Sequence, residues 1–215
     1  MKTWHHADIQ SMQQRYRAMF INSLSGFKSA NLVGTVNSDG VENLAIVSSV
    51  FHIGADPALM GMITRPQTVR RDTVNNIKHS GFYTLNQVSE QMVHAAHQCS
   101  ARYDAEVSEF AETGLTPSYV SGFSAPFVAQ SCLKIGLQVE EIQLLEINQT
   151  ELIIGKVVLV QTDEMAIEPD GSIDIEKLGS VAISGLDRYH TTKKLTRLTY
   201  AKPDSWPEEL TFSKD

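Results

Sequence analysis

The sequence predicts a mainly β fold with added helices, organised as one domain over residues 1–215. Short apolar runs bounded by Gly, Pro, Asn and Asp recur along the chain, which is typical of strands joined by turns. Stretches with helical three- and four-residue spacing are fewer and short. The 215 residues are enough for one sizeable domain and marginal for two. Because no repeat, low-complexity tract or linker divides the chain, one sheet with helices around it is the simplest arrangement.

The first predicted element is an N-terminal helix over about residues 8–25. Asp8 can cap this helix, and Gly26 ends it. Apolar side chains recur between them at helical spacing, at Ile9, Met12, Tyr16, Met19 and Phe20. We expect the helix to lie on the surface of the sheet or against a partner subunit.

The next region is predicted to be a hairpin followed by a strand, a helix and another strand. In chain order, we expect strands over 30–37 and 41–50 around a turn at 38–40, a loop at 54–57, a strand over 59–64, a helix from Thr68 or Asp72 to about Lys78, and a strand over 82–86. The strand over 41–50 shows little strict alternation. Such a strand is either buried on both faces or faces a ligand on one.

The second half of the chain is predicted to be rich in strands. In chain order, we expect helices over 89–97 and 107–112, long strands over 131–142 and 151–162, a turn at 169–171, a short strand over 173–178 with a helical turn anchored by Asp174, a last strand over 195–200, and an irregular tail over about 202–215. The two long strands lie close together in sequence and should dominate the sheet.

Composition and charge exclude several classes of partner. The formal net charge of −7 and the pI near 5.5 argue against non-specific binding to nucleic acid or acidic membranes. No apolar run reaches the roughly 20 residues of a membrane span, and the N-terminus lacks the apolar core of a signal peptide. Cys99 and Cys132 are far apart and lack metal-ligand spacing. We therefore expect a cytoplasmic protein without a membrane or nucleic-acid partner.

Small and polar residues in and after the strand over 41–50 form the first candidate site. These residues are Asn43, Ala45, Ser48 and Ser49. Their amide and hydroxyl groups are suited to the polar edge of a planar ligand, and Ala45 leaves room for a ring against the backbone. An ordinary strand, whose serines bond to neighbouring backbone, explains the pattern equally simply and is favoured by periodicity alone.

Basic and hydroxyl residues at a predicted helix start form the second candidate site, and they are Arg65, Thr68, Arg70, Arg71, Asp72 and Thr73. The first turn of a helix offers unpaired N–H groups and the positive end of a dipole, so added arginines make a competent phosphate site. Asp72 would cap the helix or orient an arginine, because it cannot donate to phosphate. A solvated, charged helix start is the open alternative.

Histidines and motifs narrow the chemistry further. His52 follows the serine-bearing strand and is a candidate to hydrogen-bond a cofactor or move protons, as is His190 from the far end of the chain. The sequence contains no Gly-x-Gly-x-x-Gly, no phosphate-binding P-loop and no Gly-x-Ser-x-Gly motif. We therefore nominate no nucleophile, no metal site and no catalytic side chain.

An ordered series of sequence blocks resembles the flavin reductase-like, FMN-binding split-barrel family over about residues 20–190. The blocks are 20–35, 43–49, 51–53, Asp56-Pro57, Arg65-Pro66, 71–73, Asn76-Ile77, 81–86, Cys99-Ser100, Glu109-Phe110 and 114–117. An ordered series is far more specific than any one block. The resemblance favours the ligand interpretation of both candidate sites.

The resemblance implies a split β-barrel, a homodimer and FMN bound without a covalent bond near the subunit interface. It implies that Asn43, Ala45, Ser48 and Ser49 touch the flavin ring and ribityl chain. It also implies that the phosphate end is formed or supported by Arg65, Arg71, Asp72 and Thr73. Thr68, Arg70, His52 and His190 are added from local chemistry alone.

The activity that the resemblance implies is an NAD(P)H-dependent reductase that passes hydride from NADH or NADPH to FMN. The electrons would then reach a small-molecule substrate or, through released flavin, a partner oxygenase. Two alternatives stay open: an FMN-binding electron carrier or sensor without this activity, and a structural dimer module that binds another ligand such as haem. Ile46 and Ala58 stand where many relatives have Pro, and residues 184–190 replace the ending of better-studied reductases, which leaves substrate choice open.

Overall fold

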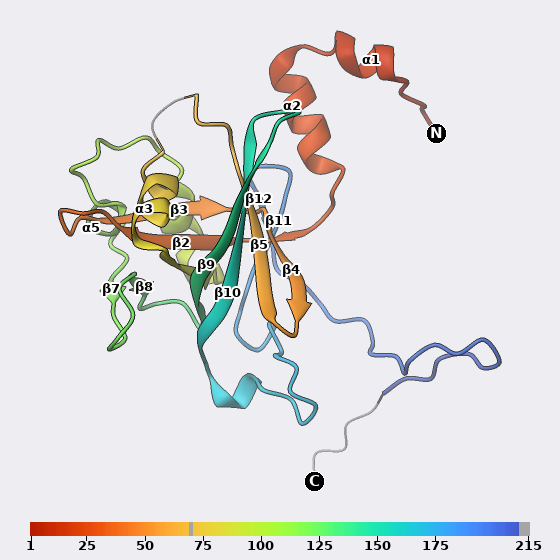
Figure 1. Ribbon diagram of the computed structural model, residues 1–215. Coiled ribbons are helices and arrows are strands. Elements are labelled where there is room, and N and C mark those ends of the chain that lie inside the picture. Colours follow the sequence, from red (N-terminus) through yellow and green to blue (C-terminus); the bar gives the residue numbers. More distant parts are fainter. Residues whose placement is uncertain (69–70, 211–215) are drawn as a thin grey trace.

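The computed structural model describes residues 1–68 and 71–210 and is dominated by one antiparallel sheet (Figure 1). The strands are β1 (Lys28–Ser29), β2 (Asn31–Val36), β3 (Glu42–Val47), β4 (Val50–Ala55), β5 (Ala58–Thr64), β6 (Phe82–Gln87), β7 (Pro117–Ser118), β8 (Phe127–Val128), β9 (Leu133–Leu145), β10 (Thr150–Thr162), β11 (Ala182–Ser184) and β12 (Arg188–His190). The helices are α1 (His6–Ser11), α2 (Gln14–Ser23), α3 (Asp72–Ser80), α4 (Val93–Gln98) and α5 (Glu109–Thr113), with short 3-10 turns η1 (Glu90–Met92) and η2 (Glu164–Ala166). The mainly β class with added helices is confirmed.

The seven strands of the main sheet are ordered β3-β2-β6-β9-β10-β5-β4. A flat sheet of this width would separate its two edge strands by about 29 Å, at about 4.8 Å per strand spacing. The edge strands β3 and β4 are nevertheless joined by Ser48 and Ser49 alone. Three Cα steps, from Val47 to Val50, span at most about 11 Å. The sheet must therefore curl until its edges approach, and because no ladder joins β3 to β4 among the described residues, the barrel is split between them.

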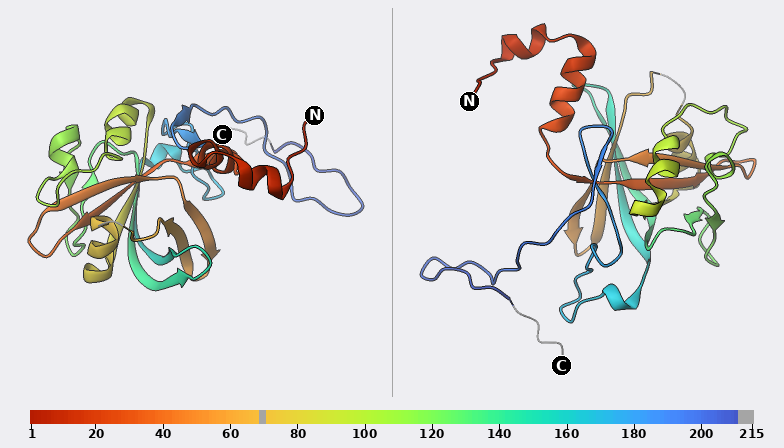
Figure 2. Two further views of the ribbon diagram at one scale, coloured as in Figure 1. Left: turned by 90° about the horizontal axis from the view of Figure 1, so that it is seen from above. Right: turned by 180° about the vertical axis from the view of Figure 1, so that it is seen from behind.

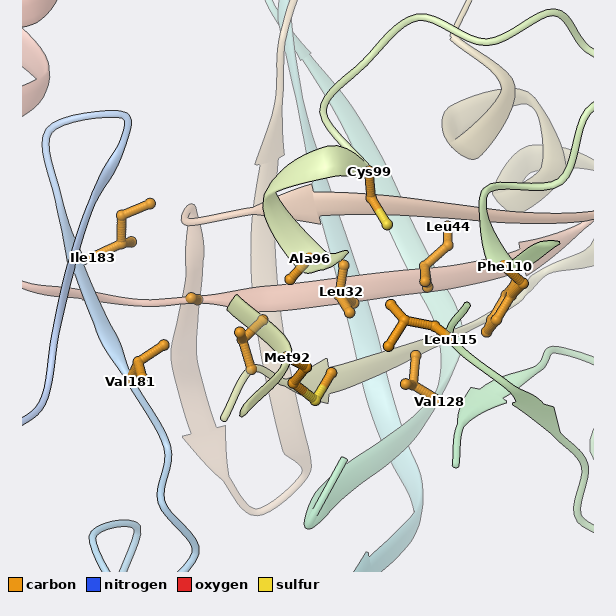
Figure 3. Packing of buried hydrophobic residues seen from close by; sticks show 12 residues of the cluster. Leu32, Leu44, Met92, Ala96, Cys99, Phe110, Leu115, Val128, Val181 and Ile183 are labelled. Atoms are coloured by element: carbon orange, nitrogen blue, oxygen red, sulfur yellow. The ribbon is translucent and has the colours of Figure 1, made fainter. Parts of the chain in front are cut away.

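Two hydrophobic cores fill the space on either side of β2 and β3. One lies between these strands, α4 and α5, where Leu32 and Leu44 meet Ala96, Cys99 and Phe110 (Figure 3). The other fills the barrel around Val33, Met62, Tyr83, Leu137 and Ile153. Alternate residues of β3 face the two cores, since Leu44 and Ile46 pack in the first and Val47 packs in the second.

Helix α3 begins at Asp72 and ends where Gly81 adopts a left-handed conformation with φ of 71°. Its buried side chains are Val74, Asn76 and Ile77, and Ile77 packs in the barrel core. The predicted helix is confirmed, but neither Asp72 nor Thr68 is its N-cap. Arg71 occupies that position without a side-chain capping bond, and Asp72 is the first helical residue, where a carboxylate suits the helix dipole.

The N-terminal helices α1 and α2 and the extended C-terminal arm over 191–210 project from the same side of the barrel, well apart from each other (Figures 1 and 2). Neither α1 nor α2 has a buried residue, so the N-terminal helix does not lie on the sheet, which was one of the two expectations for it. The predicted single helix is broken at Met12 and Gln13. Asp8 does help to cap the first turn, but from its third position: the N-cap residue is His5, and the Asp8 carboxylate accepts the backbone N–H of His5 at 2.8 Å.

Several predicted strand boundaries are wrong. The strand expected over 41–50 ends at Val47, and β4 runs into the first two residues of the loop predicted at 54–57. Only an isolated bridge, Ile167 to Ile173, replaces the strand expected over 173–178, although Asp174 does anchor a turn by accepting N–H groups of the next residues. The strand expected over 195–200 is likewise only a bridge, from Leu198 to Glu209, within the extended C-terminal arm.

Candidate functional site

The crossover from β3 to β4 places two polar residues at the split in the barrel. Ser49 donates its hydroxyl to the Ile63 carbonyl on β5 at 2.6 Å, which fixes the start of β4. Ser48 is half-buried and makes no side-chain hydrogen bond among the described residues. The Ser48 hydroxyl therefore has hydrogen-bonding capacity for a ligand at this edge, whereas the Ser49 hydrogen is already used.

Asn43, near the start of β3, joins this strand to α3 and α5. Its Oδ1 accepts the Thr73 hydroxyl of α3 at 2.7 Å and the Thr35 hydroxyl of β2 at 3.3 Å. Its Nδ2 donates to both carboxylate oxygens of Glu109, at 3.1 and 3.0 Å. Both polar atoms of this amide are therefore bonded within the protein.

Glu109 is a buried carboxylate at the first position of α5. Only 7% of the residue is exposed, and its Oε2 also accepts the backbone N–H of Leu44 at 2.9 Å. Burial raises the pKa of Glu109, and the charge of Asp72 raises it further, while the hydrogen bonds from Leu44 and Asn43 oppose the shift. The side chain links the edge strand to the region around the start of α3.

The start of α3 is cationic. Arg71 at the N-cap is half-buried, and its Nε is buried with no hydrogen-bond partner in the described part of the chain. Burial lowers the pKa of Arg71, and the charges of Arg65 and Arg102 lower it further. No ion pair to a carboxylate is found for these three arginines within residues 1–68 and 71–210.

A guanidinium N–H without a partner, among positive charges that pair with no carboxylate within residues 1–68 and 71–210, fits an anion. A buried donor without a partner is costly, and the first turn of α3 adds unpaired backbone N–H groups and a positive dipole end beside it. The charges of Arg65 and Arg102 act on Arg71 at this position. The residues present therefore fit a phosphate monoester.

Glu151 on β10 contacts both the loop that follows β5 and helix α3. Its carboxylate accepts Gln67 Nε2 at 3.0 Å and pairs with Lys78 Nζ of α3 at 2.6 Å. Gln67 lies in the loop that follows β5, so the loop and the helix are fixed to one strand. Gln67, two residues after Arg65, and the helix that begins after Arg71 are therefore both tied to β10.

A polar cleft of about 100 Å³ lies against α3, next to this network. Its lining includes Asn43, Asp72, Asn75, Asp104 and Glu109. The cleft is acidic and small, so it suits neither a phosphate nor a flavin ring. The cationic start of α3 is the better ligand site.

The structure brings part of the predicted set together and leaves part of it apart. Asn43 and Thr73 are in direct contact, and Ala45 lies on the same face of β3 as Asn43. Arg65 and Arg71 share one electrostatic environment. Thr68 is exposed in the loop between them, and Arg70 lies outside the described residues.

The predicted histidines lie away from the arginines. His52 is exposed on β4, opposite Met60, and makes no side-chain hydrogen bond to the other site residues within the described part of the chain. His190 Nε2 lies 2.7 Å from Ser184 Oγ, and its ring stacks near Phe27 with centroids 4.9 Å apart.

No helix of the described residues has the length and apolar character needed to cross a membrane.

Sequence reasoning did not single out Glu109, Thr35, Asn76 or Arg102 as site residues. Glu109 follows Asn43 by 66 residues, so spacing offers no signal for their contact. Asn76 donates to Thr35 Oγ1 at 3.1 Å, and both are buried by the packing of α3 on β2. Thr35, Asn76 and Glu109 each lie in a block of the family resemblance, whereas Arg102 lies in none.

Comparisons with known proteins agree with this fold. The sequence model of the family described as "Flavin reductase like domain" matches residues 24–175. A Shewanella frigidimarina NCIMB 400 protein, provisionally named a flavin reductase with split barrel domain, is 52% identical and superposes with a TM-score of 0.90, over 94% of this chain and 100% of that one.

Two more distant structures share the fold. Nitrilotriacetate monooxygenase component B from Bacillus cereus is 21% identical, with a TM-score of 0.81 over 92% of this chain and 98% of that one. Flavoredoxin of Desulfovibrio vulgaris (Miyazaki F) is 24% identical, with a TM-score of 0.68 over 84% of this chain and 92% of that one. The split barrel is therefore common to all three structures.

Proposed function

The chain belongs to the flavin reductase like domain family, and from this premise we propose that it is an FMN-binding oxidoreductase that accepts hydride from NADH or NADPH. The observation that carries the proposal is the orphaned Nε of Arg71 at the cationic start of α3. A phosphate monoester would satisfy this donor and neutralise the arginines around it. Riboflavin, which has no phosphate, would not.

The ring of the flavin would then lie along the crossover between β3 and β4. Ser48 offers a hydroxyl without a partner among the described residues, and the first turn of α3 is held beside this edge by Thr73. Ala45 lies on the same face of β3 as Asn43 and carries the small side chain that a ring against the backbone requires. When bound, FMN would supply the hydride chemistry, and these residues would bind and orient it.

We propose further that the electrons pass to a small-molecule substrate or to a partner oxygenase. A relative of the same fold is a monooxygenase component B, which makes an oxygenase the partner to test first. Both cysteines are free, Cys99 buried and Cys132 exposed, in keeping with the proposed cytoplasmic location.

The protein is also proposed to act as a homodimer. Large apolar side chains on both projecting ends are open to solvent: Leu24 is 65% exposed, Phe27 67%, Tyr200 90% and Trp206 92%. A ten-residue helix such as α2 is marginal in water without packing. A second copy placed between the two ends would cover both.

Light scattering should give a dimer mass for the full chain and a smaller mass for Trp206→Glu. A monomeric full chain at micromolar concentration would contradict the proposed homodimer.

Steady-state oxidation of NADH and NADPH with added FMN tests the reductase activity. Turnover that depends on FMN and exceeds the rate without protein supports the proposal and identifies the preferred donor. Tight FMN binding without turnover would instead establish an electron carrier or sensor. A protein that ignores FMN would favour a structural module with another ligand.

A further inference from the structure

We propose that Glu109 is a positioning residue for the anion site at the start of α3, acting through Asn43 and Thr73. The inference rests on the proposed function, because the anion is taken to be the FMN phosphate. Glu109 itself does not touch the ligand. Its role is to fix the orientation of the Asn43 amide, which in turn holds Thr73 in the first turn of α3.

The chemistry of Glu109 is unusual for its location. It is the one acidic or basic side chain among the described residues that is buried, and it takes part in no ion pair among them. A buried charge without a cationic partner is expensive unless hydrogen bonds satisfy it. Here its hydrogen-bond partners are N–H donors, one from Leu44 and the others from the Asn43 amide. A neutral side chain of similar size would avoid the cost, so the carboxylate calls for a specific explanation.

The explanation lies in what a carboxylate can do. Ionised Glu109 only accepts hydrogen bonds, so the Asn43 amide must turn its NH₂ toward it. The Asn43 carbonyl oxygen then points the other way and accepts the hydroxyls of Thr73 and Thr35, at 2.7 and 3.3 Å. The direction of the whole chain of hydrogen bonds is thus set by one buried charge.

The same network holds α3 at two points. Thr73 in the first turn is bound through Asn43, and Asn76 in the next donates to Thr35 Oγ1 at 3.1 Å. Both attachments end on the β2–β3 pair, where Thr35 is directly opposite Asn43. Since Arg71 and the unpaired N–H groups of the first turn move with α3, the network determines where the anion site stands relative to β3.

A glutamine at position 109 should disturb this arrangement without changing size. Its own NH₂ would face the Asn43 NH₂, and where the Asn43 amide turns over to relieve this contact, its oxygen no longer accepts from Thr73. We expect Glu109→Gln to reduce the preference for FMN over riboflavin about tenfold, as the loss of a hydrogen bond to a charged group would. Glu112→Gln, an exposed carboxylate on the same helix, is the matched control and should leave the preference unchanged.

Exchanging the two groups should restore the network. In the double variant Asn43→Asp with Glu109→Gln, the carboxylate sits at position 43 and accepts from Thr73, Thr35 and the new amide. The oxygen of that amide in turn accepts the N–H of Leu44. Asn43→Asp alone places two carboxylates face to face and should lower both stability and FMN preference. The double variant should recover the wild-type preference to within about threefold, since every hydrogen bond is again paired. A merely space-filling Glu109 would show no such rescue.

The readout is the ratio of dissociation constants for riboflavin and FMN, with thermal unfolding measured alongside. An unchanged ratio in folded Glu109→Gln, or no recovery in the folded double variant, would overturn the positioning role while leaving FMN binding intact. A wild-type ratio near one would instead refute the anion site and the proposed function with it. If Glu109→Gln does not fold, Thr73→Val removes the last link of the network and must lower the ratio by itself.

Discussion

Replacing Arg71 by alanine tests whether this side chain binds the phosphate at the anion site. Arg71 Nε is buried without a partner among the described residues, so removing this atom breaks no hydrogen bond within them. If this N–H binds phosphate, the variant should lose a hydrogen bond to a charged group, worth about 1.5–3 kcal/mol. That loss corresponds to an increase of about 10- to 150-fold in the Kd for FMN, at about 1.4 kcal/mol per tenfold. The loss should be incomplete, because Arg65, Arg102 and the first turn of α3 remain.

The assay is a titration of flavin fluorescence with FMN and with riboflavin. Riboflavin binding should be nearly unaffected by Arg71→Ala, since it carries no phosphate. Arg188→Ala removes one exposed positive charge from β12 and controls for the change in net charge. An equal loss of affinity for both flavins, or a similar loss in the control, would refute the assignment of Arg71 to the phosphate.

Three further predictions concern packing and titration. A Cβ at Gly34 would lie 2.2 Å from the Pro126 carbonyl oxygen, so Gly34→Ala should lower the free energy of unfolding by about 1–3 kcal/mol, and an unchanged urea midpoint would contradict this. Burial raises the pKa of Glu109 above its ordinary 4.5, so the folded state binds this proton more tightly than the unfolded state. The resulting stabilisation is fully present below pH 4.5 and is lost as the pH rises through the raised pKa. The free energy of unfolding of the wild type should therefore fall relative to that of Glu109→Gln over this window, and parallel plots of unfolding free energy against pH would contradict it. Burial also raises the pKa of Cys99 to about 12, so iodoacetamide at neutral pH should label the exposed Cys132 and spare Cys99, as peptide mapping can check.

Local patterns predicted those parts of the fold whose cause is local. The helix that ends at Gly81, the strand over residues 82–87 and the long β9–β10 pair each follow from periodicity and turn residues near them. The end of β3 at Val47 does not, because Val, Ile and Ser continue past it as in an ordinary strand. It ends there because the chain must cross the split to the opposite edge of a curled sheet.

The sequence indicated which types of residue gather at the candidate site, but not which of them are hydrogen-bonded to one another. Arginines beside a helix start suggested phosphate from sequence alone, and Arg71 lies at that start. The role of Asn43 was not predictable, because its partner Glu109 comes from a helix 66 residues further on. The projecting ends were not predictable for a related reason: single-chain patterns contain no information on what covers Tyr200 or Trp206.

The most direct test of FMN-dependent reduction is the visible absorption spectrum of the purified protein with FMN, before and after anaerobic NADH or NADPH. We expect the oxidised flavin bands, near ~370 and ~450 nm, to be perturbed by binding and then to bleach promptly with at least one donor. Free, unperturbed FMN in the presence of the protein would contradict FMN binding and, with it, the proposed reduction. Bound flavin that neither donor bleaches would retain the site but refute the reductase activity.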